Sequence, residues 1–388
     1  MKLKSLLIGS AALAAAATGA KAADPIIVPE PEPMEYVRVC DVYGAGFFYI
    51  PGTETCLKIG GMVRYQINWD ENDDGWRKYA RGELNIDARS ETEYGTLGAF
   101  IKLRATSNTG PTLTRASSWS GGTNAAGDAL PNLPVGLVNS GDAYSTGVGS
   151  TVGLQQAIIS LGGLSMGLSD TLYDASISGE FDNGGGDRVH FINYTFAAGN
   201  GFTATLALEE ADSNYDYTPN FVGKVGVAQG WGTADFYAAY DATAEEFALK
   251  AIVKADLTER VFAQAMAIYE SGINFYSTDP FDLSGYGQPS VARFGSQWSI
   301  GGLVGYKFTP KLKASLGAQY YDKVGHDLPA FAWGGDVDVI NAGLTVDYEI
   351  VENFDAKLAV NYTNIDAPTA SGLPDDHWSG FVRFQRNF

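Results

Sequence analysis

The charged residues that could act together in this 388-residue chain form two groups of opposite sign. The basic group is Arg64, Arg81, Lys102 and Arg104, on three consecutive segments in which apolar and polar residues alternate. Alternate residues of a β-strand point to the same face, so these four side chains would lie side by side on one wall. Such a wall would place fixed positive charge beside a wet lumen.

The acidic group lies in a glycine-rich segment, residues 172–186, which carries Asp174, Glu180 and Asp182. If this segment folds toward the basic wall, carboxylates and cations would face each other across a narrow aperture. The field across it would orient polar solutes and slow apolar ones, which must shed ordered water. Two plainer readings stay open: arginines that only solvate a wide lumen, and acids in an ordinary exposed loop.

Histidine gives little support for catalysis. The chain has three, and a hydrolase of the Ser-His-acid kind needs one beside a nucleophile and an acid. His326 and His377 fall in or beside predicted loops, and His190 lies within a strand that has no nucleophile motif. We therefore expect no enzyme, no catalytic residue, no metal site and no cofactor.

The first 22 residues have the features of a cleaved secretory signal. Lys2 and Lys4 precede an Ala-rich apolar run at 6–17, and Ala20 and Ala22 supply small residues for signal peptidase. The run is too short to cross a bilayer as a helix. An uncleaved N-terminal anchor is the alternative.

The two cysteines of the chain, Cys40 and Cys56, predict a disulfide, because an exported chain meets an oxidising compartment. Two free buried thiols are the alternative. Residues 24–35 are rich in Pro and Glu, and proline disfavours both helix and sheet pairing. We expect residues 23–55 to form a periplasmic arm with a disulfide-clamped end, and residues 56–388 to form a second unit.

From residue 56 onward the pattern has period two. Apolar and polar residues alternate in 63–69, 81–89 and 97–106, and again in segment after segment from 298 to the end. Aromatic residues stand at the ends of the apolar faces while Ala, Leu and Val fill the middles, and the opposite faces are polar. This distribution predicts an all-β, antiparallel, up-and-down barrel that spans a membrane around a wet lumen.

The connections alternate between short and long. Short turns are predicted near 92–95, 162–163, 198–201, 230–232, 256–259, 309–310 and 351–353, and long loops near 70–75, 107–151, 172–186, 211–219, 242–245, 271–292, 324–334 and 367–376. Seven turns and eight loops give sixteen strands with both chain ends in the periplasm. An error of one hairpin would give fourteen or eighteen.

The formal net charge of −19 argues against nucleic acid as a partner, because phosphate binding needs clustered Lys and Arg. The excess of acid favours cations only slightly in a pore, since the basic wall and the acidic segment oppose each other locally.

Three stretches carry a resemblance to a known family. They are YVRVCDVYGAGFFYIPGTETC at 36–56, LGGLSMGLSDTLYD at 161–174 and GFVRFQRNF at 380–388. The chain resembles the alphaproteobacterial general porins, outer-membrane diffusion channels, along its whole length. Phe384 and Phe388 match the family's C-terminal assembly signal, although Arg386 stands where an apolar residue is common.

The resemblance implies a homotrimer of sixteen-stranded barrels, each with its third loop folded inward as a constriction. It identifies residues 174–186 as that loop and places Arg64, Arg81, Arg104 and Arg188 near the family's cationic wall. It makes 107–151 the second loop. It also implies a multi-pass protein of the bacterial outer membrane, in contact with lipid and lipopolysaccharide and inserted by the barrel assembly machinery.

We expect a passive channel for small hydrophilic solutes and ions. One alternative is a substrate-specific channel, for oligosaccharides for example, which would need a row of lumen aromatics. Another is a surface receptor or adhesin in which the barrel is only an anchor.

Overall fold

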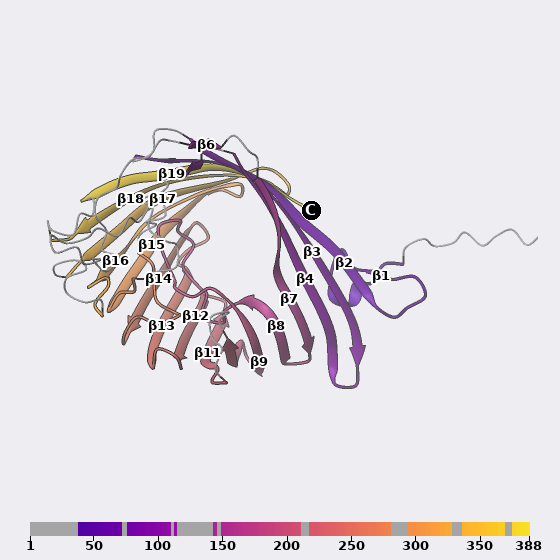
Figure 1. The fold of residues 1–388 in the computed structure, drawn as a ribbon. Coiled ribbons are helices and arrows are strands. Elements are labelled where there is room, and N and C mark those ends of the chain that lie inside the picture. The colour runs from indigo at the N-terminus through magenta and orange to yellow at the C-terminus, as the bar shows by residue number, and fades with distance from the viewer. Residues whose placement is uncertain are drawn as a thin grey trace, which may run out of the picture. The chain divides into compact units, whose positions relative to one another are not determined.

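Sixteen long antiparallel strands close into one barrel within the part of the chain that the structure describes (Figure 1). The structure is a computed structural model that describes residues 38–71, 76–109, 112–114, 143–145, 149–210, 217–280, 294–327, 336–368 and 375–388. The strands of the barrel are β2 (Cys56–Asp70), β3 (Arg77–Thr92), β4 (Gly95–Thr109), β7 (Gly149–Leu161), β8 (Leu164–Asp170), β9 (Arg188–Gly199), β10 (Phe202–Glu210), β11 (Asn220–Gln229), β12 (Gly232–Asp241), β13 (Glu246–Asp256), β14 (Val261–Glu270), β15 (Trp298–Thr309), β16 (Leu312–Asp322), β17 (Asp338–Val351), β18 (Phe354–Asp366) and β19 (Asp376–Asn387). The predicted strand number and topology are confirmed.

The last strand closes the sheet on the first. β19 pairs with β2, with Gln385 opposite Arg64. The Phe388 N–H donates to the Gly61 carbonyl at 3.1 Å, and the Gly61 N–H donates to the Phe388 carbonyl at 3.0 Å. Closure matters because a spanning sheet cannot leave unpaired backbone groups in hydrocarbon.

The apolar faces point outward, away from the lumen. Val304 is 57% exposed and Leu316 is 64% exposed. Such exposure of apolar side chains is unfavourable in water but suits a wall that faces lipid. Aromatic pairs lie near the strand ends, as in Trp298 with Tyr320, whose ring centroids are 5.3 Å apart. The inward faces carry the charged and amide side chains. The lumen is therefore polar, as predicted.

The alternation is interrupted in the β4–β7 pair. Lys102 lies opposite Gln156 but Leu103 lies opposite Leu154, so Gln155 is the extra residue of a bulge. This bulge interrupts the period-two pattern in residues 151–162. The short turns and long loops otherwise fall where the sequence predicts them.

A small lobe precedes the barrel wall. It contains the helix η2 (Asp41–Tyr43) and the strand β1 (Phe48–Tyr49), which pairs with β2. The predicted disulfide between Cys40 and Cys56 is present. Phe47 packs beneath it, with the Arg89 guanidinium 5.3 Å from its ring centroid. The disulfide thus ties the lobe to the first residue of β2.

Two of the expected segments fall largely outside the described residues. They are the N-terminal 37 residues, which include the predicted signal, and most of loop 107–151. Within that loop the structure describes β5 (Thr112–Thr114) and β6 (Ala143–Ser145), which pair with each other. No helix in the described ranges is long and apolar enough to cross a membrane.

Candidate functional site: the pore constriction

The connection between β8 and β9, residues 171–187, enters the lumen. Its Glu180 carboxylate lies 2.6 Å from the Lys357 ammonium on β18 and 3.4 Å from the Arg383 guanidinium on β19. Both partners belong to strands far from β8 and β9 in the barrel order. The loop therefore crosses the interior, and we call residues 171–187 the constriction loop.

Two inward glycines make room for the tip of this loop. A side chain at Gly317 on β16 would come within 2.6 Å of the Phe181 ring, and one at Gly343 on β17 would come within 2.9 Å of the Phe181 Cβ. Gly317 and Gly343 lie opposite each other in the register, so they form one bare patch on the wall. Phe181 fills this patch, and Asn361 donates to the Glu180 carbonyl at 2.8 Å.

Hydrogen bonds to the wall fix the rest of the tip. The Ser178 N–H donates to the Gln264 side chain at 2.8 Å. The Gln319 side chain accepts from the Asn183 N–H at 3.0 Å and donates to its carbonyl at 3.1 Å. The loop thus lies against β14 and β16–β18.

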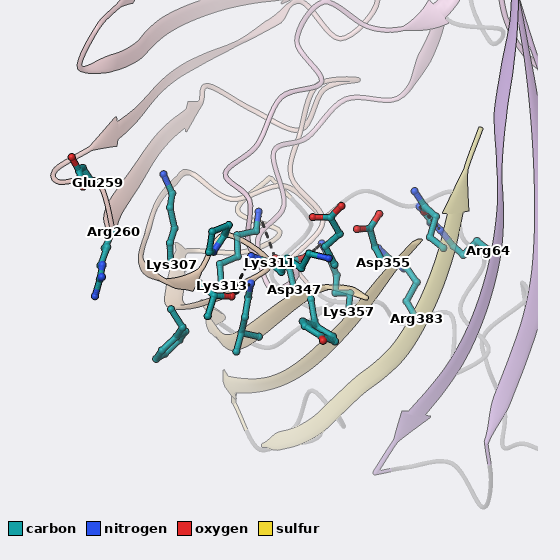
Figure 2. Close-up of a pocket in the computed structure, with 17 residues that line it drawn as sticks. Arg64, Glu259, Arg260, Lys307, Lys311, Lys313, Asp347, Asp355, Lys357 and Arg383 are labelled. Atoms are coloured by element: carbon teal, nitrogen blue, oxygen red, sulfur yellow. Dashed lines mark hydrogen bonds and ion pairs between the residues drawn. The ribbon is translucent and has the colours of Figure 1, made fainter. Parts of the chain in front are cut away.

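A cavity of about 790 Å³ lies beside the Glu180 contacts, and Figure 2 shows its lining. Lys357, Arg383 and Arg64 follow neighbouring strands along one side, whereas Arg260 lies apart at the far end. Cross-strand register explains the grouping, because Lys357 lies opposite Arg383, and Asp347 lies opposite Lys357. The Asp347 carboxylate lies 3.4 Å from Lys357.

The predicted basic residues divide into unpaired and paired cations. Arg64 lies opposite Arg81 in the strand register. The Arg64 guanidinium donates to the Gln385 side chain at 2.7 Å, and the Arg81 guanidinium donates to the Thr106 hydroxyl at 3.2 Å. Lys102 lies on the same wall, opposite Asn85. Within the described ranges none of these three forms an ion pair with a carboxylate.

The other two predicted cations have acidic partners. Arg104 lies 2.5 Å from the Glu83 carboxylate, which cancels most of its charge. Arg188 lies 3.8 Å from Asp170 and donates to Gln155 at 2.7 Å. Both side chains belong to the wall, but a nearby carboxylate partly neutralises the charge of each.

The three predicted acids have three different surroundings. Glu180 contacts the β18–β19 cations, as described above. Asp174 is exposed at the start of the loop. Asp182 is mostly buried and accepts the Ile177 N–H at 3.0 Å, and burial raises the pKa of Asp182 to about 7. Asp182 therefore organises the loop itself and carries only part of its charge at neutral pH.

Sequence reasoning did not single out Lys357 or Arg383 for the site. A signal existed, since each stands between two outward apolar residues and so faces inward: Lys357 between Ala356 and Leu358, Arg383 between Val382 and Phe384. What was missing was the path of the loop, which decides which inward cations meet its carboxylate.

A second segment also packs against the constriction loop. Residues 271–280 begin the connection after β14, which the sequence predicted only as a long loop. The Glu209 carboxylate on β10 accepts from the Thr171 hydroxyl at 2.5 Å and from the Tyr276 hydroxyl at 3.1 Å. The Asn183 side chain accepts the Asp279 N–H at 3.2 Å. The two segments therefore form one packed layer over the inner wall.

Comparisons with known proteins agree with this geometry. The family model described as "Porin subfamily" matches residues 24–382. Porin Omp2a of Brucella melitensis biotype 1 is 36% identical over 409 aligned positions, and Porin Omp2b of Brucella suis biovar 1 is 34% identical over 417; each alignment covers all of both chains.

Solved structures share the fold at low sequence identity. The outer membrane channel DcaP of Acinetobacter baumannii superposes with a TM-score of 0.58 at 15% identity, covering 88% of this chain and 99% of that one. OmpF of Salmonella typhi, solved in complex with daunomycin, superposes with a TM-score of 0.54 at 11% identity, covering 86% and 98%. At such identities these structures support the barrel architecture alone.

Proposed function

The chain belongs to the porin subfamily, so it is an outer-membrane channel and not an enzyme, and on that premise we propose how its lumen selects solutes. Small hydrophilic solutes and ions diffuse passively through a water-filled constriction between the constriction loop and the wall of β2–β4. The observation that carries the proposal is the contact of Glu180 with Lys357 and Arg383, because it holds the loop across the lumen.

The charges at this aperture are unequal. The loop's Glu180 is already compensated by two cations, and Asp182 carries only part of its charge near neutral pH. On the facing wall Arg64, Arg81 and Lys102 have no carboxylate partner among the described residues. Fixed cations at a narrow, wet passage raise the local concentration of anions. We therefore assign a preference for small anions to the constriction, despite the net charge of −19 for the whole chain.

Reconstitution of the purified protein into planar bilayers tests this proposal. We expect a stable ohmic conductance and, under a KCl gradient, a reversal potential of the sign given by chloride permeation. Saturation or block by one sugar would favour the substrate-specific alternative. A barrel without measurable conductance would refute the channel, and a cation-type reversal potential would refute the assigned selectivity.

The homotrimer is a proposal that family membership supports. One structural neighbour, OmpT of Vibrio cholerae, is described in a trimer form and superposes with a TM-score of 0.52 at 11% identity. Chemical crosslinking in outer-membrane vesicles tests the state: a trimer band supports it, and a monomer at all crosslinker levels contradicts it.

We also propose that residues 1–22 are removed on export and that Phe384 and Phe388 direct insertion by the barrel assembly machinery. Phe384 lies on the outward face of β19, and Phe388, directly after the strand, is 62% exposed. The outward belt as a whole would contact lipid and lipopolysaccharide. N-terminal sequencing of the membrane-inserted protein should begin at Ala23; a start at Met1 would show that the segment is retained.

A further inference from the structure

Lys250 is a buried lysine on the inner wall of the barrel. It lies on β13, and its side chain is 1% exposed. Its ammonium donates to the carbonyls of Ala175 and Gly184 at 2.8 Å each, and to the carbonyl of Tyr173. The three acceptors all belong to the constriction loop, so every donor of this ammonium is used there.

The acceptors come from both limbs of the loop. Tyr173 and Ala175 lie on the limb that leaves β8, whereas Gly184 lies on the limb that returns toward β9. One ammonium therefore ties the two limbs to each other and to the wall. The contacts of Gln264, Gln319 and Asn361, in contrast, hold the tip.

The surroundings of Lys250 are costly for a charge. The carboxylates of Asp174 and Asp182 on the constriction loop act on the ammonium electrostatically, but neither is among its hydrogen-bond partners. Its charge is balanced by carbonyl dipoles and by two aromatic faces, with the Tyr173 centroid at 3.9 Å and the Tyr237 centroid at 5.2 Å. Burying an ammonium is unfavourable unless its hydrogen bonds are complete, and here they are.

A lysine that only needed a place in the lumen would reach water. Lys254 does so, two inward positions further along β13. Lys254 is on the same face of β13, is only partly buried and has no hydrogen bond to the loop within the described part of the chain. Lys254 acts on the loop only through its field at Asp182, so the two lysines separate the effect of an inward charge from that of hydrogen bonds to the loop.

We propose that Lys250 is the positioning residue of the pore: it holds the constriction loop against the β13 wall and so sets the width of the aperture. This inference rests on the proposed function, since the aperture matters only if solutes pass through it. Removing the ammonium strands three buried carbonyls, and the loop recovers their hydration only by leaving the wall.

The test compares Lys250→Met with Lys254→Met in two assays. The first places a thiol at Ile177, which is 3% exposed in the loop, and measures its labelling rate in the folded barrel. The native cysteines are joined in the disulfide, so Ile177→Cys supplies the one reactive thiol. We expect Lys250→Met to raise the labelling rate by roughly tenfold or more, because stranding even one acceptor costs about one tenfold step in the loop equilibrium. Lys254→Met should leave the rate unchanged.

The second assay records single channels. We expect Lys250→Met to replace one stable open level by flicker that includes a larger level, while Lys254→Met keeps one level. If Lys250→Met fails to assemble, Lys250→Gln, which retains an amide donor, should give an intermediate labelling rate and intermediate flicker. An unchanged labelling rate in the Lys250 variants would overturn the inference. Faster labelling in a barrel that never conducts would refute the proposed function and leave the loop contact standing.

Discussion

Neutralising the opposed pair Arg64 and Arg81 tests the assigned selectivity most sharply. The two residues lie directly opposite each other on β2 and β3, and each guanidinium has a neutral partner, Gln385 or Thr106. Changing either to Gln removes one fixed charge from the wall and strands no buried carboxylate. The barrel should therefore assemble normally, and only the field in the lumen should change.

The size of the effect follows from Coulomb's law. At roughly 6 Å in water a unit charge acts on a monovalent ion with about 0.7 kcal/mol, and screening at ~0.1 M salt reduces this to about 0.4 kcal/mol. Loss of the charge disfavours an anion and favours a cation by that amount, so the chloride-to-potassium permeability ratio should fall about fourfold for each variant. The two effects act through the field and should multiply to about fifteenfold in the double variant.

Reversal potentials under a KCl gradient measure that ratio directly. Arg386→Gln is the matched control, because Arg386 lies on the outward face and is exposed at the rim, with its guanidinium 3.2 Å from the Asn353 carbonyl. It should leave the reversal potential unchanged. An equal shift in the control and in Arg64→Gln would mean that total charge, rather than the constriction, sets selectivity. No shift in the Arg64/Arg81 double variant would refute the reasoning.

Two further predictions concern the lobe and the loop. Replacing Cys40 and Cys56 by Ser should destabilise the lobe by about 3 kcal/mol, because their bridge closes a loop with a sequence separation of 16; limited proteolysis should cut residues 41–55 while the barrel stays intact, and equal protection with and without the bridge would contradict this. Burial raises the pKa of Asp182 above its unfolded value to about 7. Protonation of Asp182 therefore stabilises the folded loop, and this stabilisation is fully present below about pH 4. It is lost as the pH rises through about 7. Open-channel noise should therefore increase from about pH 5 to about pH 9, and Asp182→Asn should remove that rise; noise with the same pH dependence in the variant would assign it to another group.

Much of the fold could be predicted from the sequence, because the period-two alternation of a barrel strand is local. The outward faces ending in Trp378, Phe384 and Phe388 require a lipid-facing sheet, and the glycine-rich turns fix where each strand reverses. The disulfide also follows from having two cysteines in an exported chain. The bulge at Gln155 is the kind of feature that the pattern hides, since one extra residue exchanges the two faces.

The candidate site was harder to predict, because it depends on where a loop crosses the barrel. Glu180 meets Lys357 and Arg383, which are about half the chain away in sequence, and the bare patch at Gly317 and Gly343 that admits Phe181 has no sequence signature of its own. Lys250 illustrates the limit. In the sequence it is one more inward lysine, and only the three carbonyls around its ammonium distinguish it from Lys254.

The central claim is that residues 171–187 lie in the conducting path. Modification of a thiol at Ser178, which is exposed on the loop, tests it most directly. Because both native cysteines are bridged, Ser178→Cys carries one reactive thiol, and Thr258→Cys in the exposed β13–β14 turn is the matched control. We expect a bulky thiol reagent to reduce the single-channel current of Ser178→Cys in discrete steps and to leave Thr258→Cys unchanged. Full labelling of Ser178→Cys without any change in current would contradict a constriction formed by this loop.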